Sequence, residues 1–401
     1  MPVPIDIGST YVTGIHVSCV AALREHYGLS GGPVKAIDVG QMLGDVAEDL
    51  KQAIGINTEA VRSRMTKFGF AAEDWKSWRM DDGLEILVPG GFNVTRDKNG
   101  ATLMHPRGDV TLPPSAIMPA GGYFFDNIIR QQPIDEDQLD PRDNLEEFKP
   151  VTEADLDHYE RMAGAAAATG RVVVGSFGGT SFGDIAHVPG PALPHPKGIR
   201  DVAEWYVSTR SRRDYIHKVF EGQCEIALKN LERIAQRVGP LVNVINVCGT
   251  DFGTQTSSFC SEGTFRELWF PYYKRVNDWI HRDTPWKTFK HSCGAVSKFI
   301  PAFIEAGFDI LNPVQCSAAG MDPETLKQRY GRDLTFWGGG VDTQQVLPFG
   351  SPEEVREQVL RRCEVFARGG GFMFAAIHNI QACTPVKNIV AMIDAVHEFN
   401  G

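Results

Sequence analysis

The C-terminal half of the chain alternates short apolar runs with amphipathic stretches. The runs are rich in β-branched and aromatic residues, as in parallel strands that are buried on both faces. They lie at 241–248, 288–294, 308–315, 334–338 and 371–377. The stretch after one of them begins with Ser351 and Pro352, an N-cap followed by a proline at the first helical position. Strands that alternate with helices predict βα units and a parallel sheet.

Three further runs in the N-terminal half bring the predicted strands to eight. Residues 171–178 form a valine-rich run that ends in a glycine turn, and weaker runs lie at 34–39 and 3–7. Eight parallel strands with crossover helices close into a (β/α)8 TIM barrel of the α/β class. We therefore expect one domain over residues 1–401. Because the first strand begins at Val3, the barrel floor is expected to be covered by residues 80–150 or by chain ahead of the given start.

The alternation breaks between about residues 80 and 150. Short runs at 84–88, 92–95 and 101–104 resemble β-strands, and residues 98–100 (Lys-Asn-Gly) have the composition of a hairpin turn. Stretches rich in Pro and Asp follow, up to residue 150. We interpret this segment as a β-hairpin insertion that forms a lid between barrel strands 2 and 3. A small separate domain is the alternative, although no flexible linker marks its ends.

Composition and charge exclude several classes of function. The chain has 401 residues, a net charge of −10 and no block of Lys or Arg, which argues against a nucleic-acid or anionic-membrane partner. No apolar run reaches the ~18 residues of a membrane-spanning helix, and no secretion signal is visible. The 8 cysteines lack the tight spacing of a disulfide framework. We therefore expect a cytoplasmic globular protein.

His291 and Cys293, at the end of a predicted strand, are the most informative pair for chemistry. Residues two apart in a strand point to the same face, so the imidazole and the thiol converge. Catalytic groups of barrels gather at the C-terminal strand ends, and a nitrogen with a sulfur donor suits Zn²⁺. A buried histidine beside an inert core cysteine is the alternative for this pair taken alone.

Three more side chains at predicted strand ends bear on this site. Cys316 follows the next predicted strand and His378 follows the last one. Either would close a three-ligand site with a fourth position for substrate, as in catalytic zinc centres, although Cys316 is equally explained as a small apolar residue at the barrel mouth. Asp251 ends the preceding strand and is expected to act as a fourth ligand, an orienting partner of His291 or a proton acceptor. A helix N-cap is its structural alternative.

Substrate contacts are expected from residues close to the same strand ends. Gln255 is interpreted as an orienting amide, and His187 as a pocket residue, with an exposed loop histidine as the alternative. Aromatic side chains are expected to form part of an apolar pocket wall, among them Phe92, Phe124, Phe252 and Trp337. The glycine runs lack the spacing of phosphate-binding loops, and no GxSxG hydrolase motif is present.

Several segments, read together, resemble the uroporphyrinogen decarboxylase superfamily. They are 250–255, 291–294, 300–301, 305–309, 312–315, 338–342 and 377–380, with weaker similarity back through 198–205. The resemblance covers nearly the whole chain and implies the (β/α)8 barrel. In the metal-free decarboxylase branch, an arginine-bearing segment after the first strand binds a substrate with eight carboxylates. Here residues 7–11 hold no arginine, and unpaired buried charges are costly, so this branch is disfavoured.

The other branch comprises zinc methyltransferases that work with corrinoid proteins, such as methylcobamide:coenzyme M methyltransferases. Their zinc motif is His-x-Cys with a cysteine at the last strand end. His291 and Cys293 match the first two positions, whereas the third falls on His378, which leaves Cys316 as a competitor. A neutral imidazole in place of a thiolate makes the metal a stronger Lewis acid, which favours activation of an ether-like methyl donor.

The resemblance therefore implies a zinc-dependent methyltransferase that exchanges a methyl group between a small substrate and the cobalamin (corrinoid) of a separate protein. We expect O-demethylation of a methoxylated aromatic compound. Asp251, His291 and Cys293 would be catalytic, and Asn379, next to the last candidate ligand, would contact substrate. A metal-free decarboxylase and a non-catalytic barrel that binds the corrinoid partner are the alternatives. A homodimer is one assembly that the sequence allows.

Overall fold

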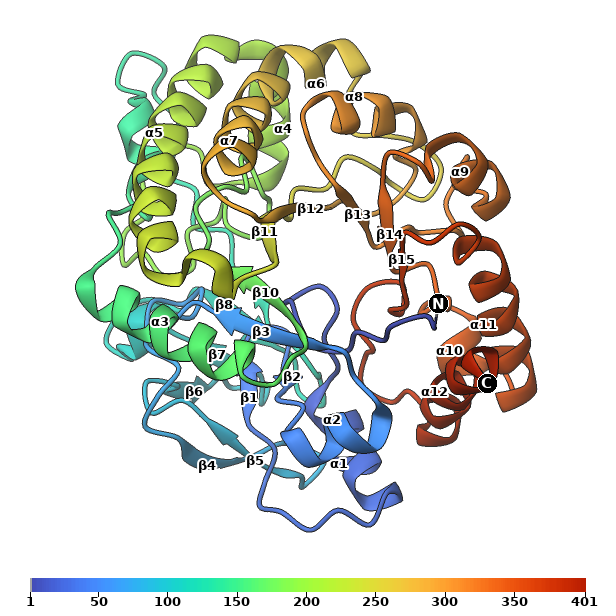
Figure 1. Ribbon diagram of the computed structural model, residues 1–401. Helices are drawn as coiled ribbons and strands as arrows, with labels where there is room; N and C mark the ends of the chain where they lie inside the picture. Colours follow the sequence, from blue (N-terminus) through green and yellow to red (C-terminus); the bar gives the residue numbers. More distant parts are fainter. Residues whose placement is uncertain (1) are drawn as a thin grey trace.

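A computed structural model describes residues 2–401. Its central element is a curled parallel sheet of seven strands in the order β15-β14-β13-β12-β11-β10-β3 (Figure 1). These strands are β3 (Thr58–Arg62), β10 (Val172–Ser176), β11 (Val244–Cys248), β12 (Lys287–His291), β13 (Ile310–Asn312), β14 (Thr335–Trp337) and β15 (Phe372–Met373). The order follows the chain from β10 onward, as expected for consecutive βα units.

The two edges of this sheet meet through the N-terminal segment. Ile5 forms parallel bridges to both Phe374 and Ile56. The amide of Asp6 donates to the carbonyl of Phe374, and the amide of Asn57 donates to that of Ile5. The first predicted strand is thus reduced to a single bridged residue, yet it closes the ring. The predicted α/β TIM-barrel class is confirmed.

Helices cover the outside of the barrel (Figure 1). Most of them return the chain between consecutive strands, and α11 begins at the predicted cap, where Ser351 and Glu354 form a capping box. The helices are α1 (Val17–His26), α2 (Glu48–Ile54), α3 (Glu153–Ala167), α4 (Val202–Ser211), α5 (Arg213–Val238), α6 (Glu262–Leu268), α7 (Phe270–Asp283), α8 (Ile300–Glu305), α9 (Pro323–Tyr330), α10 (Val346–Phe349), α11 (Pro352–Phe366) and α12 (Val386–Asn400). Within residues 2–401, none is long and apolar enough to cross a membrane.

Apolar side chains form two separate cores. The larger core packs the outer faces of the strands against the helices. The smaller core fills the barrel interior and consists of Val174, Val244, Phe289, Ile310, Trp337, Met373 and Ala375. Because side chains alternate along a strand, this inner set tells which residues face the barrel axis. The same alternation tells which polar residues at the carboxyl ends of the strands face the barrel interior.

The predicted second strand at 34–39 is wrong. Its central part forms β1 (Ala36–Asp38), which pairs antiparallel with β2 (Leu43–Gly44) outside the barrel. The second barrel strand is β3, which the apolar pattern did not reveal. Its outward-facing Glu59 binds Lys51 and Arg171, and a charged residue in the strand hides the apolar run.

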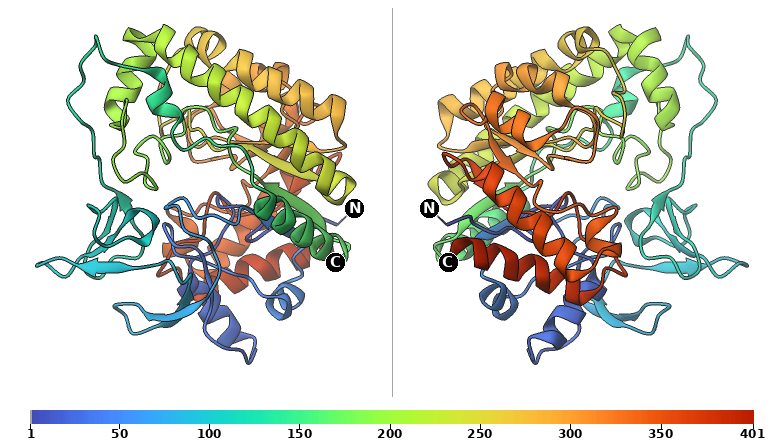
Figure 2. Two further views of the ribbon diagram at one scale, coloured as in Figure 1. Left: turned by 90° about the vertical axis from the view of Figure 1, so that its left-hand side faces the viewer. Right: turned by 90° about the vertical axis from the view of Figure 1, so that its right-hand side faces the viewer.

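Two small antiparallel sheets lie between β3 and β10 in the chain. One pairs β4 (Lys76–Arg79) with β5 (Glu85–Val88). The other joins β6 (Val94–Arg96), β7 (Thr102–Met104), β8 (Ala116–Met118) and β9 (Asp126–Asn127). The hairpin between β6 and β7 is the one predicted around residues 98–100. Figure 2 shows both sheets to one side of the barrel; a lid function stays a prediction.

Candidate metal centre

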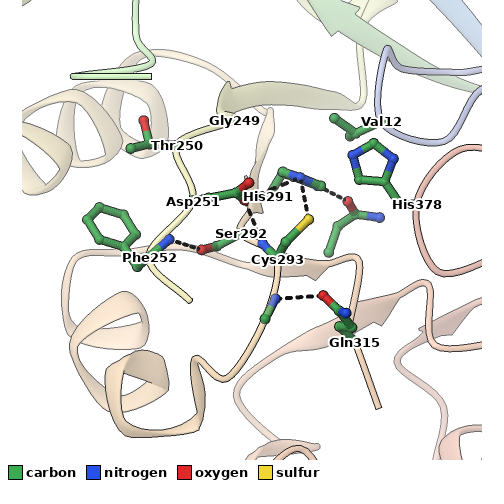
Figure 3. A network of polar contacts seen from close by, with 12 residues as sticks. Val12, Gly249, Thr250, Asp251, Phe252, His291, Ser292, Cys293, Gln315 and His378 are labelled. Atoms are coloured by element: carbon green, nitrogen blue, oxygen red, sulfur yellow. Dashed lines mark hydrogen bonds and ion pairs between the residues drawn. The ribbon is translucent and has the colours of Figure 1, made fainter. Parts of the chain in front are cut away.

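Three side chains converge at the carboxyl ends of the barrel strands. His291, Cys293 and His378 each bring a ligand atom, and these atoms lie within 4.8 Å of one another (Figure 3). The Cys293 Sγ lies 3.3 Å from the His291 Nε2. A tetrahedral zinc with bonds of about 2.3 Å to sulfur and 2.0 Å to nitrogen places these two atoms about 3.5 Å apart. The donor set and the spacing therefore fit a zinc ion.

The ring of His291 is held in one orientation by β13. Its Nδ1 lies 2.5 Å from the Oδ1 of Asn312, whose amide nitrogen donates to the carbonyl of Trp337 at 2.8 Å. Since the Asn312 nitrogen is used in that bond, its oxygen must accept, and the His291 Nδ1 must carry the proton. The Nε2 then presents a lone pair toward Cys293, as a metal ligand requires.

Neighbouring strand ends fix the loop that carries Cys293. Its backbone amide donates to the Asp251 Oδ1 at 2.6 Å, and the same oxygen lies 3.6 Å from the His291 Nε2. The hydroxyl of Ser292 accepts from the amide of Phe252, and the amide of Gly294 donates to the side chain of Gln315 (Figure 3). Asp251 thus orients the thiol-bearing loop and remains close enough to the donors to act at the metal.

Burial sets the protonation of the three donors. It lowers the pKa of His291, against the opposing effects of Asp251 and the bond to Asn312. Burial also lowers the pKa of His378 to about 4, and the neighbouring His291 adds to this shift. Burial raises the pKa of the Cys293 thiol well above its ordinary value, and the Asp251 carboxylate adds to it. At neutral pH both imidazoles are uncharged, whereas the thiol must lose its proton when it binds a cation.

His378 lies on an irregular loop after β15. Its φ is +69°, in the left-handed region that non-glycine residues rarely adopt. The next residue, Asn379, is buried and holds this loop to the N-terminal loop: it accepts from the amide of Gly14 at 2.6 Å and donates to the carbonyl of Tyr11 at 3.0 Å. Its amide nitrogen also donates to the Gln41 Oε1 at 2.8 Å, so Asn379 positions this loop, and its contact with substrate stays a prediction.

The competing ligand, Cys316, lies outside this group. Among residues 2–401, the cluster of donors contains His378 and does not include Cys316. The Cys316 thiol donates to the carbonyl of Val314 at 3.2 Å and packs against the outer core. Burial raises its pKa to about 11, which is the behaviour of an inert core thiol.

The predicted pocket aromatics are dispersed in the structure. Trp337 is buried inside the barrel, where its Nε1 donates to Asp6 at 2.7 Å. Phe252 packs into the outer core, with its ring 5.0 Å from that of Phe265. Phe92 is buried within the insertion, and Phe124 is exposed. Large rings are selected for buried area as often as for ligand contact, which explains the dispersion.

The two remaining predicted substrate residues lie at the surface. Gln255 is exposed, and its amide nitrogen donates to the Gln344 Oε1 at 3.0 Å. His187 is exposed on the loop after β10, as its structural alternative predicted. Neither side chain has a contact with the three metal donors among the polar contacts of the described residues.

A buried lysine next to His291 was missed. The Lys290 ammonium is fully buried and donates to the carbonyls of Thr250 and His291 at 2.7 and 2.6 Å. It also lies 3.2 Å from the Cys248 Sγ and 4.9 Å from the centre of the Phe252 ring. Within residues 2–401 it has no ion pair with a carboxylate. A lysine inside a predicted buried strand was the available signal.

The fold and the site together define a closed α/β barrel with an N₂S donor set at its mouth. The uroporphyrinogen decarboxylase (URO-D) family model matches residues 196–399, about half of the chain, and the protein belongs to this family.

The chain is also similar to two proteins of known sequence or structure. The uroporphyrinogen decarboxylase of Methylococcus capsulatus (strain Bath) is 30% identical over 103 residues, which make up 26% of this chain and 27% of that protein. The match thus spans about a quarter of that relative. A solved structure described as a methyltransferase from Methanosarcina mazei superposes with a TM-score of 0.55 at 12% identity, covering 100% of this chain and 95% of the other. That similarity shows a shared fold.

Proposed function

We propose that this protein is a zinc-dependent methyltransferase that exchanges a methyl group between a small substrate and a separate corrinoid protein. The observation that carries the proposal is the convergence of His291, Cys293 and His378 at the barrel mouth. The structural relative described as a methyltransferase shares the fold along the whole chain, which agrees with it.

The three donors would leave a bound zinc with one net positive charge, because two neutral imidazoles and one thiolate surround a divalent ion. When bound, zinc would supply Lewis acidity to the substrate oxygen from which the methyl group leaves. The breaking C–O bond leaves its electron pair on that oxygen, which then takes up a proton. Asp251, whose side chain is 29% exposed and lies 3.6 Å from the His291 Nε2, would hold or deliver that proton.

The proposal names both the acceptor and the donor of the methyl group. The methyl group would be accepted by the cobalt of a corrinoid held by a separate protein. A methoxylated aromatic compound is the small substrate that we propose, because a positively charged metal site suits a leaving phenolate.

The direct test is the metal content of the purified protein. We expect about one zinc per chain in protein prepared without chelators, as for a three-ligand catalytic site. His291→Ala should remove it, whereas Cys316→Ser, a thiol outside the group, should retain it. Methyl transfer from a methoxylated aromatic to a reduced corrinoid protein would then be followed by the visible absorbance of the corrinoid. Full zinc in His291→Ala would overturn the assignment.

Membership of the family also supports a second candidate, a metal-free decarboxylase. The two candidates differ in what metal removal does. Release of CO₂ from a carboxylic substrate by protein stripped of zinc would favour the decarboxylase. Methyl transfer that disappears with the zinc and returns when zinc is added would favour the methyltransferase.

A further inference from the structure

Three polar residues on neighbouring strands face the barrel interior near its mouth. Val174 and Val244 belong to the inner core, so Ser176 and Asn246, two residues further along β10 and β11, face the same way. On β3, the inward Thr58 donates to the buried Asp6, so Arg62, four residues further, also faces inward.

These three residues form a continuous row across the sheet. Ser176 pairs with Arg62 in the register of β10 and β3. Gly175 pairs with Ile245 in the register of β10 and β11, which places Asn246 beside Ser176. The row, defined here as the β3–β11 row (Arg62, Ser176 and Asn246), lies on the three strands that precede β12 in the sheet.

Each member of the β3–β11 row has a buried polar atom without a hydrogen-bond partner among residues 2–401. The atoms are the Arg62 Nε, the Ser176 Oγ and the Asn246 Oδ1. Ser176 is only 6% exposed. The large majority of buried side-chain polar atoms in proteins are paired, so three unpaired atoms in adjacent residues need an explanation. A ligand that completes their hydrogen bonds is the simplest one.

The charge of this row is positive and poorly compensated. The Arg62 Nη2 donates to the carbonyl of Gly8, and the carboxylate of Asp45 lies 3.9 Å from the Nη1. Asp6, the buried carboxylate deeper in the barrel, already accepts from Ser9, Thr58 and Trp337. Asp6 is therefore saturated, and the Arg62 Nε–H has no acceptor among the described residues.

Two residues of the row are partly exposed, although the unpaired atom of each is itself buried. Arg62 keeps 18% of its side-chain exposure and Asn246 is half-buried, although both face the barrel axis. Cys293 and His378 are half-buried in the same way. Since these inward-facing residues all lie toward the carboxyl ends of their strands or in the loops that follow, their partial exposures lie at the same end of the barrel.

From this row we propose that the small substrate carries a carboxylate, which binds to Arg62 and Ser176. The inference rests on the proposed function and names its substrate class, a carboxylate-bearing methyl ether such as a methoxybenzoate. Arginine and serine would donate their unpaired hydrogens to the carboxylate oxygens. Asn246 would present its amide to the same group, because the two ends of a carboxamide exchange by a half turn. The methoxy oxygen would then lie toward His291, Cys293 and His378.

Binding of a plain carboxylate tests the inference without any methyl transfer. We expect benzoate to bind about ten- to a hundredfold more tightly than its neutral isostere benzamide in isothermal titration calorimetry, the gain of a charge-assisted hydrogen bond. Arg62→Met should remove this preference and leave benzamide binding and zinc content unchanged. Ser176→Ala should reduce it by a smaller factor. Equal binding of the two probes, or absence of benzoate binding, would overturn the inference.

Arg64→Met is the matched control. It removes the same charge two residues further along the chain, where the guanidinium pairs with Asp155 and Glu73. It should leave benzoate binding intact. If it weakens benzoate binding as much as Arg62→Met does, the effect comes from general charge and the carboxylate subsite is wrong.

Methyl transfer separates failure of this inference from failure of the proposed function. We compare 4-methoxybenzoate with 4-methoxybenzamide as methyl donors to a reduced corrinoid protein. Equal rates from both would overturn the carboxylate subsite and leave the methyltransferase standing. Tight, Arg62-dependent benzoate binding in a protein that holds no zinc and transfers no methyl group would overturn the methyltransferase and leave the carboxylate subsite standing.

Discussion

The two sides of the candidate metal centre are held in different ways. On the β12 side, His291 is fixed by its bond to Asn312, and the backbone of Cys293 is fixed by Asp251. On the opposite side, His378 lies on a loop with a left-handed backbone, and its Nδ1 contacts only the amide of the next residue among the polar contacts of residues 2–401. The β12 side is therefore preorganised by side chains of neighbouring strands, whereas the β15 side depends on a loop conformation.

This difference suggests how the site is built and how it responds to change. A rigid pair of ligands sets most of the affinity, because little ordering remains when the metal binds. His378, on a loop with a strained backbone, would complete the site with a less ordered ligand.

Removal of a ligand should cost more on the β12 side. We expect Cys293→Ala to weaken zinc binding on the order of a thousandfold or more, since both the anion and a preorganised donor are lost. His378→Ala should weaken it by about a hundredfold, because two ordered ligands remain. Zinc affinity would be measured by competition with a chromophoric chelator. Equal losses in the two variants would show that the loop side is as preorganised as the strand side.

Loss of the residue that orients His291 should have the next largest effect. Asn312→Ala removes the acceptor for the His291 Nδ1 proton, and loss of such a partner typically costs about ten- to a hundredfold in metal affinity. Asn379→Ala, which loosens the loop next to His378, should cost less. A greater loss in Asn379→Ala would reverse our assignment of the rigid side. Both variants need an unfolding curve, since each removes buried hydrogen bonds.

Sequence reasoning named the donors on both sides, His291 and Cys293 on the rigid side and His378 on the loop side, but left Cys316 as a competitor of His378. The His-x-Cys spacing predicts convergence because a strand places alternate residues on one face, and the structure confirms that His291 and Cys293 lie together. The partner Asn312 was not identified, because its importance comes from the register of β13 against β12, which no local pattern reveals. The choice of His378 over Cys316 depends on the path of an irregular loop.

For the fold as well, local sequence patterns predicted some elements and missed others. Strands β10 to β15 lie at predicted runs, whereas β3 was missed because outward charges such as Glu59 interrupt its apolar pattern. The carboxyl end of β3 also supplies Arg62, so the missed strand concealed the β3–β11 row. Aromatic residues were poor indicators of the site, because the packing of cores uses the same side chains, as Phe92 and Phe252 illustrate.

Metal binding should depend on pH mainly through Cys293. The pKa of this thiol is raised by burial, so the metal-free site holds its proton at pH 7, and binding should release about one proton per zinc. Affinity should then fall about tenfold for each pH unit as the pH decreases. Calorimetry in two buffers of different ionisation enthalpy measures the released proton. Zinc binding without proton release would show that the thiol is already ionised.

Protonation of a buried imidazole should affect the stability of the metal-free protein, at a lower pH than the thiol affects zinc binding. The pKa of His378 is lowered to about 4, below its unfolded value near 6.5, so the folded state resists protonation. The contribution of His378 to the stability of the metal-free protein is therefore fully present above about pH 6.5 and is lost as the pH decreases toward 4. Urea unfolding at several pH values should show this slope, and His378→Gln should flatten it. An unchanged slope would mean that the loop side is solvated.

The smallest expected effect is that of Lys290, which supports the β12 side from behind. Its ammonium lowers the pKa of Cys293, against the larger effect of burial, and it joins the ends of β11 and β12 through two carbonyls. Lys290→Met keeps the apolar stem but removes the charge, so zinc affinity at pH 7 should fall only a few-fold. The free energy of unfolding should fall by about 1–3 kcal/mol, since two buried carbonyls lose their donor.

Lys287→Met, which changes an exposed lysine on the same strand, is the control and should change neither the zinc affinity nor the free energy of unfolding. If Lys290→Met lowers stability but leaves both the zinc affinity and its pH dependence unchanged, the buried charge supports only the strand ends, and the preorganisation of Cys293 rests on Asp251 alone.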